Sequence, residues 1–193
     1  LSEEKKKEYA GAIVDACRRL TGLITNILKL NKLENQQIFP ETKEFDLDTQ
    51  LSECIIRLDN VLERKDLEVE VDIEERVKVK SDEELLDLVW NNLLSNAIKF
   101  TPPGGQITVC LKTEGEAAVI RISDTGCGIG NDVGKHIFEK FYQGDSSHAT
   151  QGNGLGLALV KRVVDIVGGD IAVESELEKG STFTVRLKKV QEV

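Results

Sequence analysis

The order of apolar and polar positions first shows a helical seam. From residue 9 to residue 30, apolar residues recur at alternating steps of four and three. They are Tyr9, Ile13, Ala16, Leu20, Leu23, Ile27 and Leu30. This is the a/d spacing of a coiled coil or a helical bundle, so it predicts a long helix that needs a partner helix. The alternative is that the stripe packs on the chain's own domain.

The next part of the chain predicts a short linker followed by mixed structure. Pro40 ends helix propagation, and Asp46 is a candidate N-cap for a helix to about Lys65. Residues 67–73 alternate as a strand, and residues 77–80 look like its hairpin mate. Ser81 and Glu84 have the spacing of a capping box that opens a helix, which "TPPGG" then ends.

The second half of the chain predicts four strands and two helices. Residues 106–112 and 117–124 alternate as strands that pair as neighbours, and a closing pair of strands lies near the end. The remaining expected segments are a short helix near 134–141, a polar stretch 142–151, a helix 155–167, and strands 169–175 and 181–189. The pattern is α+β: a two-layer sandwich with one long helix in front. Its sheet is expected to be mixed but mostly antiparallel, with helices on one face.

Composition narrows the class of protein. The chain has 193 residues, 40% hydrophobic and 31% charged, which is ordinary for a soluble globular protein. A net charge of −9 argues against nucleic acid as a partner, because a phosphate backbone requires a basic face. No apolar stretch approaches the roughly 20 residues that a membrane helix needs. We expect a cytoplasmic piece of a longer protein, which is compatible with a membrane anchor upstream.

The cysteines and histidines do not predict a metal cluster. Cys17, Cys54, Cys110 and Cys127 lie far apart with no C-x-x-C pair, so we expect reduced thiols that serve as small apolar residues. The two histidines are His136 and His148. A zinc site is therefore disfavoured.

Two asparagines and a lysine mark one face of the helix that begins after Ser81. Asn92 and Asn96 are four residues apart and share a face, with Lys99 on the adjoining edge. Amide oxygens can ligate Mg²⁺ and an ammonium group can meet a phosphate. The alternative is a solvated polar stripe.

A carboxylate precedes alternating glycines at the end of the strand 117–124. Asp124 can accept a hydrogen bond from an exocyclic amine, and Gly126 and Gly128 let a flat ring approach the backbone. The alternative is an ordinary turn.

A second run of glycines precedes the apolar helix near residue 155. Gly152, Gly154 and Gly156 stand where free amides at a helix N-terminus can bind phosphate. Leu157 occupies the third-glycine position of a dinucleotide fingerprint, and no P-loop sequence occurs. The alternative is a flexible hinge. The order of all these signals within one domain makes coincidence unusual.

Together these segments resemble the ATP-binding domains of sensor histidine kinases, within the larger group that also contains gyrase, Hsp90 and MutL. The resemblance covers about residues 45–189, and the leading helix is similar to the second helix of the kinase dimerisation hairpin. "NNLLSNAIKFTPPGG" resembles the N box, "DTGCGI" the first glycine box, "IFEKFYQGD" the F box, "GNGLGLALV" the second glycine box and "GSTFTV" the last glycine-led strand. The resemblance implies a Bergerat-type ATP-binding fold.

The resemblance also implies roles for individual residues. Asp124 would bind the adenine amine, and Asn92 and Asn96 would hold Mg²⁺ and phosphate, with Asn92 and Lys99 as the catalytic residues. The other residues expected at the ATP site are Gly126, Gly128, Ile129, Phe138, Phe141, His148, Gly152, Gly154, Leu155, Gly156 and Thr182. Among these, Phe138 and Phe141 would anchor a lid, and Thr182 would join the adenine side.

The chain departs from the family pattern in two places. The lid segment 142–151 has no arginine, and His148 and Gln151 are the nearest substitutes, although His148 also fits an exposed loop residue. The box that carries the phospho-accepting histidine is absent. The γ-phosphoryl group is then expected to pass to a histidine on a missing helix of the same or a sister chain. From there it would pass to an aspartate of a response-regulator receiver domain.

The expected organisation is a partial dimerisation hairpin over residues 1–37, a linker over 38–45 and an ATP-binding catalytic domain over 46–193, with a homodimer in the intact protein. Two other functions remain open: a serine kinase or ATPase of the same superfamily, and a non-catalytic nucleotide-sensing module. Asn92 stands where gyrase-like ATPases have a water-activating glutamate, and an amide cannot act as a general base.

Overall fold

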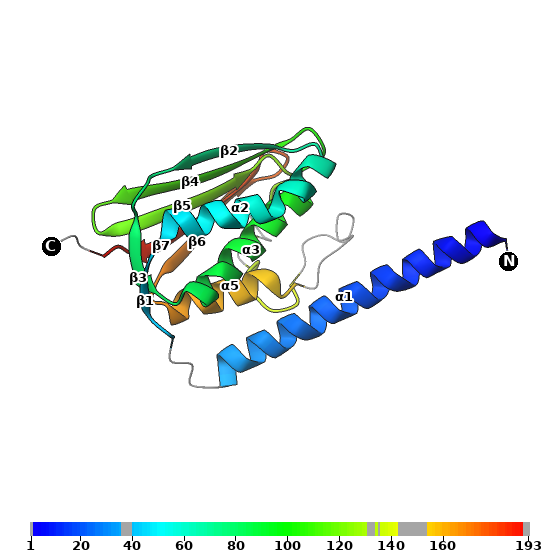
Figure 1. The fold of residues 1–193 in the computed structure, drawn as a ribbon, viewed down its shortest axis with the longest axis horizontal. Helices are drawn as coiled ribbons and strands as arrows, with labels where there is room; N and C mark the ends of the chain where they lie inside the picture. Colours follow the sequence, from blue (N-terminus) through cyan, green and yellow to red (C-terminus); the bar gives the residue numbers. More distant parts are fainter. Residues whose placement is uncertain (1, 36–39, 131–133, 135, 143–153, 191–193) are drawn as a thin grey trace.

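A computed structural model describes residues 2–35, 40–130, 134, 136–142 and 154–190 (Figure 1). In chain order the elements are α1 (Glu3–Asn35), β1 (Lys43–Asp46), α2 (Leu47–Arg64), β2 (Glu68–Ile73), β3 (Lys78–Ser81), α3 (Glu83–Phe100), β4 (Gln106–Glu114), β5 (Ala117–Asp124), α5 (Gly156–Ile166), β6 (Asp170–Glu176) and β7 (Gly180–Lys188). The predicted α+β class with one long leading helix is confirmed.

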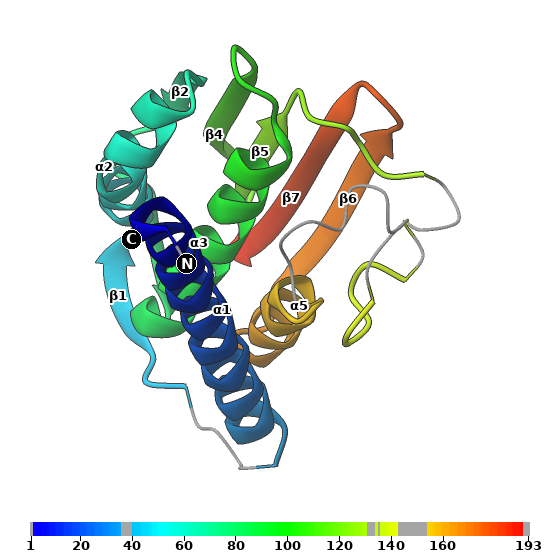
Figure 2. The same ribbon diagram turned by 90° about the vertical axis from the view of Figure 1, so that its right-hand side faces the viewer.

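One mixed sheet forms the back layer of the domain. Its five strands run in the order β2-β4-β5-β7-β6, with β2 and β4 parallel and the other neighbours antiparallel. Helices α2, α3 and α5 lie on one face of this sheet (Figures 1 and 2). Strands β4, β5 and β7 bury every second side chain against these helices, which is what period-two alternation predicts. The two-layer prediction is therefore confirmed.

Trp90 of α3 is fully buried in the core. Its indole N–H donates to the Gln50 side-chain oxygen over 2.8 Å, and the Gln50 amide donates to the Glu83 carbonyl over 2.7 Å. A buried polar side chain on α2 is thus satisfied on both sides by α3. This arrangement fixes α3, which carries the two asparagines, against α2.

Two local predictions are wrong. Strand β3 does not pair with β2 but forms a separate two-stranded antiparallel sheet with β1, a strand that falls in the expected linker. The cap of α3 is shifted by one residue: Asp82 accepts a hydrogen bond from the Leu85 N–H over 3.0 Å, whereas the Ser81 hydroxyl has no partner. Of the short helix expected near residues 134–141, residue 134 is helical and residues 136–138 form a turn.

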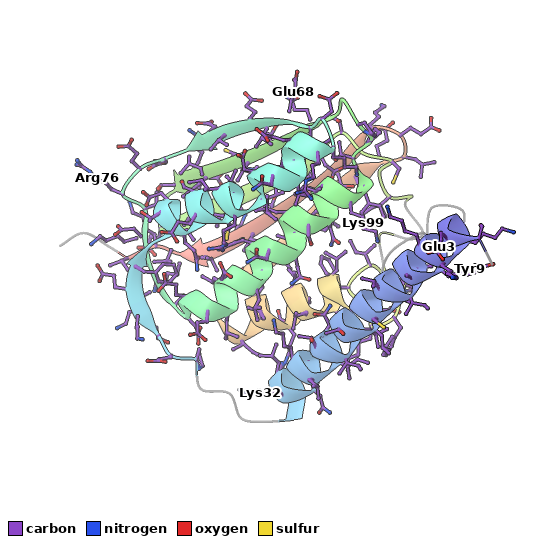
Figure 3. The ribbon with its side chains drawn as sticks, turned by 45° about the vertical axis from the view of Figure 1, so that its right-hand side comes forward. Glu3, Tyr9, Lys32, Glu68, Arg76 and Lys99 are labelled. Atoms are coloured by element: carbon purple, nitrogen blue, oxygen red, sulfur yellow. The ribbon has the colours of Figure 1, made fainter. Side chains whose placement is uncertain are left out.

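Helix α1 meets the domain at its C-terminal end. Leu30 and Leu33 are buried, and α1 packs against α5. Arg162 of α5 donates from Nε and Nη2 to the Leu33 carbonyl over 3.1 and 3.0 Å, which satisfies a carbonyl in the last turn of α1. Figure 3 shows Lys32 near this end of α1 and Tyr9 near the end that stands clear of the domain.

The predicted seam of α1 is exposed for most of its length. Tyr9, Ile13 and Leu20 are more than half exposed, at 53%, 63% and 59%. Leu30 is the buried end of the seam. The described helices include none that combines the length and apolar character needed to cross a bilayer. The four cysteines are free: Cys54 is buried as expected of a small apolar residue, whereas Cys17 is exposed.

Candidate functional site

The asparagine face of α3 lies beside the start of α5. Asn92 and Asn96 are half-buried, whereas their neighbours Leu93, Leu94 and Ala97 are buried in the core. The Asn92 amide donates to the Leu88 carbonyl over 2.7 Å. Its own oxygen then points at α5.

Gly156 opens α5 at that point. A Cβ atom at Gly156 would lie 2.9 Å from the Asn92 amide oxygen, so the absence of a side chain there leaves room for it. The N-cap residue Leu155 makes no side-chain cap hydrogen bond, and no described residue is seen to cap this helix end. The first amides of a helix carry partial positive charge and bind anions when no side chain satisfies them. An amide oxygen and an uncapped helix N-terminus therefore face one space.

Lys99 lies one turn beyond Asn96 near the end of α3. Its ammonium group is 4.3 Å from the centroid of the Phe100 ring, and burial lowers the pKa of this lysine. Lys65, just after α2, donates to the carbonyls of Ile98 and Lys99, the latter over 2.8 Å. The end of α3 is thus stabilised by a cation from α2, and the Lys99 side chain is left for other partners.

Asp124 ends β5 and begins the glycine loop, which we define as residues 124–130. The Gly126 N–H donates to its carboxylate over 2.8 Å. Burial raises the pKa of the Asp124 carboxyl, and hydrogen bonds from the backbone N–H groups of Gly126 and Ser181 oppose that shift. One carboxylate oxygen can still accept a hydrogen bond from a ligand.

Two glycines of this loop, Gly126 and Gly128, are required by close packing. A Cβ at Gly126 would lie 2.6 Å from the Phe100 carbonyl oxygen. Gly128 has a φ of +66°, and a Cβ there would lie 2.0 Å from the Glu176 carbonyl oxygen. The loop is therefore pressed against the end of α3 on one side and against the β6–β7 turn on the other.

The two expected lid anchors occupy different environments. Phe138 is half-buried against the core, whereas Phe141 is 62% exposed and has a φ of +62°. The Phe141 N–H donates to the Gly154 carbonyl over 2.8 Å. Gly154 must be a glycine, because it has a φ of +64° and a Cβ there would lie 2.6 Å from the Phe141 carbonyl carbon. Leu155, which follows, is buried in the core.

The remaining expected residues divide between the strands and the undescribed segments. His148, Gln151 and Gly152 lie outside the described residues. Thr182 pairs with Ser123, with 2.9 Å between the hydroxyl oxygens, whereas Ser181 stands opposite Asp124 in the register. Because strand residues alternate between faces, Ser181 lies on the Asp124 side of the sheet and Thr182 on the other.

Sequence reasoning missed Ser175 and Ser181. Both line an open hollow of about 340 Å³ together with Asp124, and their hydroxyl oxygens are 2.9 Å apart. The signal that could have found them is the polar interruption that they make on the inward faces of two otherwise apolar strands.

Comparisons of the sequence and the structure with known proteins identify the family. Residues 81–191 match the family described as "Histidine kinase-, DNA gyrase B-, and HSP90-like ATPase". The chain is 37% identical to the circadian input-output histidine kinase CikA of Synechococcus elongatus over 94% of its own length and 25% of that protein's. It is 34% identical to the sensor-like histidine kinase SenX3 of Mycobacterium tuberculosis over 95% of its own length and 45% of that protein's.

Solved structures share the fold. The full-length ShkA structure in complex with AMPPNP superposes with a TM-score of 0.84 at 25% identity, covering 100% of this chain and 40% of that one. The structure of ThkA in complex with the response regulator TrrA has a TM-score of 0.81 at 21% identity, covering 98% of this chain and 53% of that one, and it shows the fold alone.

The chain therefore belongs to the histidine kinase-, DNA gyrase B- and HSP90-like ATPase family. Within that family, both curated relatives named above are histidine kinases, and the ShkA structure shares the fold of the whole chain. It spans between a quarter and a half of the length of these curated relatives.

Proposed function

We propose that the chain binds Mg²⁺-ATP with its adenine amine at Asp124 and its phosphates between the asparagine face of α3 and the N-terminus of α5. The observation that carries this proposal is the Asn92 amide oxygen, directed at Gly156 where α5 begins uncapped. Lys99 adds a cation to the same side. The other residues proposed to contact or enclose the nucleotide are Asn96, Gly126, Gly128, Ile129, Phe138, Phe141, His148, Gly152, Gly154, Leu155 and Gly156. The expectation that Thr182 joins the adenine side is wrong, because Thr182 lies on the face of the sheet opposite Asp124.

The residues fit Mg²⁺ as a metal that is shared with phosphate. Asn92 and Asn96 offer neutral amide oxygens, which are hard ligands of the kind that Mg²⁺ accepts. Within the described residues, no group of three or more His, Cys, Asp or Glu side chains could form an all-protein cage. Phosphate oxygens and water would complete the coordination, and the ion would neutralise phosphate charge.

The proposed reaction is phosphoryl transfer to a histidine. The bond between the γ-phosphorus and the β,γ-bridging oxygen breaks and ADP leaves. A bond forms between that phosphorus and the unprotonated nitrogen of an imidazole, and the proton on the other ring nitrogen passes to solvent. The second step would carry the group to an aspartate of a response-regulator receiver domain. Asn92 and Lys99 contribute by positioning and charge neutralisation, which dominate catalysis of phosphoryl transfer.

The exposed seam of α1 supports the proposed division of the chain. Residues 1–37 would form one helix of a dimerisation hairpin, 38–45 the linker and 46–193 the catalytic domain. The seam residues Tyr9, Ile13 and Leu20 stand open to solvent, as expected of a surface that a second helix covers. A homodimer would bring the phospho-accepting helix of the same or a sister chain to the ATP site.

Calorimetric titration with a non-hydrolysable ATP analogue tests the proposed site. We expect binding that Mg²⁺ strengthens. We also expect Asp124→Asn to weaken it by about 30- to 150-fold, because a charge-assisted hydrogen bond contributes about 2 to 3 kcal/mol. Asp72→Asn is a matched control, since Asp72 on β2 is exposed and pairs with Lys112 over 2.6 Å.

The two variants separate the possible results. Weaker binding by Asp124→Asn alone supports the adenine assignment. Equal losses in both variants, or a wild-type chain that does not bind the analogue with Mg²⁺, would overturn the proposal.

A further inference from the structure

Ser175 of β6 makes more hydrogen bonds than its position in an ordinary strand requires. Its hydroxyl accepts from the Ile129 N–H over 2.8 Å and donates to the Gly180 carbonyl over 2.8 Å. Its oxygen is also 2.9 Å from the Ser181 hydroxyl oxygen. One half-buried side chain thus contacts the glycine loop, the β6–β7 turn and the start of β7.

The donor and acceptor roles follow from the chemistry of a hydroxyl group. A serine hydroxyl has one proton and two lone pairs. The Gly180 carbonyl can only accept, so it takes the proton of Ser175, and the Ile129 N–H occupies one lone pair. The second lone pair remains for Ser181, which must then be the donor. Every hydrogen-bonding position of Ser175 is therefore filled.

These bonds belong to a larger contact between the glycine loop and the hairpin of β6 and β7. The Glu178 N–H donates to the Cys127 carbonyl over 2.8 Å. Gly180 has a φ of +106°, and a Cβ there would lie 1.8 Å from the Asp124 carbonyl oxygen. The hairpin is therefore the surface on which the loop rests. The side-chain hydroxyl of Ser175 is what binds the far end of the loop, at Ile129, to it.

Removing that hydroxyl would leave defined groups without partners. In Ser175→Ala the N–H of Ile129 and the hydroxyl of Ser181 both lose their partner. Because Ser181 is 7% exposed, water can replace the lost bond only poorly. The same residue stands opposite Asp124 and its N–H supports that carboxylate. Loosening Ser175 would thus disturb both ends of the loop.

We propose that Ser175 is a positioning residue for nucleotide binding, which holds the glycine loop in its binding geometry through the Ile129 N–H and Ser181. This inference rests on the proposed function, because the bound molecule is the nucleotide assigned to Asp124. Ser175 itself does not need to touch that nucleotide. Its effect passes through the loop.

The experiment compares wild type with Ser175→Ala, Ser175→Thr and Ser52→Ala. Ser52 is a matched control, because its half-buried hydroxyl donates to the Asp48 carbonyl over 2.8 Å within α2. We expect Ser175→Ala to raise the dissociation constant of a non-hydrolysable ATP analogue with Mg²⁺ about tenfold. Ser175→Thr, which keeps the hydroxyl, and Ser52→Ala should stay within about twofold of wild type.

Amide hydrogen exchange without nucleotide gives a second readout. We expect the Ile129 amide to exchange about tenfold faster in Ser175→Ala and at the wild-type rate in Ser175→Thr. If wild type does not bind the analogue, the proposed function fails. Unchanged exchange of the Ile129 amide in Ser175→Ala would show separately that the Ser175 hydroxyl does not hold the glycine loop. If wild type binds, equal affinity in Ser175→Ala overturns the inference. A loss that Ser175→Thr does not restore also overturns it.

Discussion

Helix α1 and the glycine loop use apolar and polar groups in opposite ways. Most of the α1 seam faces solvent, and Leu30 and Leu33 hold the helix to α5 together with one arginine. The glycine loop has few large side chains, yet its backbone packs against α3 and the β6–β7 turn at distances that exclude a Cβ. The glycine loop obtains its packing within this chain, whereas we propose that a further helix covers the exposed seam of α1.

The difference has a physical origin. A helix satisfies most of its backbone hydrogen bonds internally. A long helix can therefore remain formed while its apolar face is exposed to solvent. A loop cannot, because its N–H and C=O groups need partners from elsewhere in the fold. The loop at Asp124 obtains them from the hairpin, so its geometry is set before any ligand arrives.

Among the variants, Gly128→Ala is expected to lower the free energy of unfolding the most. A φ of +66° and a Cβ position 2.0 Å from the Glu176 carbonyl oxygen combine strain with overlap. We expect the free energy of unfolding to fall by about 3 kcal/mol or more. Gly115→Ala is the control, because it has a φ of +62° but no atom within 4 Å of its Cβ. Urea denaturation should show a loss of about 1 kcal/mol there. Equal losses would contradict the close contact.

A charge in the α1 seam should separate the helix from its expected partner. We expect Leu20→Glu to weaken self-association about tenfold or more, because a charge would enter an apolar interface. Thr25→Glu adds the same charge on an exposed position outside the seam. Sedimentation equilibrium measures both variants. If Thr25→Glu dissociates the chain as strongly as Leu20→Glu, the seam is not the interface.

The pKa of Asp124 predicts that the difference in unfolding free energy between wild type and Asp124→Asn depends on pH. Burial raises this pKa above its ordinary value of 3.8, so the folded state binds the proton more tightly than the unfolded state. The wild-type protein therefore loses stability as the pH rises through that window, whereas Asp124→Asn stays neutral. We expect the variant to be more stable than wild type at pH 7.

That advantage should shrink as the pH falls towards 3.8, the ordinary value of an aspartate. Denaturation curves of both proteins at several pH values measure the difference. A variant that binds nucleotide poorly but is no more stable than wild type at pH 7 would show that the backbone hydrogen bonds outweigh burial.

The smallest change in stability is expected at the C-terminal end of α1. In Arg162→Ala the Leu33 carbonyl loses two hydrogen bonds, so the last turn of α1 should open with about 1 kcal/mol less free energy. Hydrogen exchange of the last turn of α1 reports this opening. Lys161→Ala, which removes an exposed ion pair with Asp165, should leave that exchange unchanged. Faster exchange in both variants would mean that α5 itself has loosened.

Much of the fold could be predicted from the chain because its signals are local. The helix after Asp46 begins and ends where the sequence indicates, although the Asp46 side chain makes no cap hydrogen bond. The strands ending at Asp124 and starting at Gln106 pair as expected. Spacing alone marks Gly126, Gly128 and Gly154 as exceptional positions. The structure shows the backbone contacts that require them.

Strand pairing beyond nearest neighbours could not be predicted in the same way. Alternation shows which face of a strand is buried but not which strand lies beside it. Strand β2 therefore pairs in parallel with β4, and β3 with β1, although β2 and β3 are consecutive. The cap lies at Asp82 rather than Ser81 because Ser81 is still the last residue of β3, and the spacing of residues does not show where that strand ends.

By itself, the sequence determined the α+β class, the order of its motifs and the chemistry that Asn92, Asn96 and Asp124 can perform, since these depend on residue type and spacing along the chain. The tertiary structure decided that Ser181, not Thr182, shares the side of Asp124, and that Ser175 joins the glycine loop to the hairpin. The reason is that a hydroxyl acquires its partners from the register of neighbouring strands. That register is set by contacts between residues far apart in the chain.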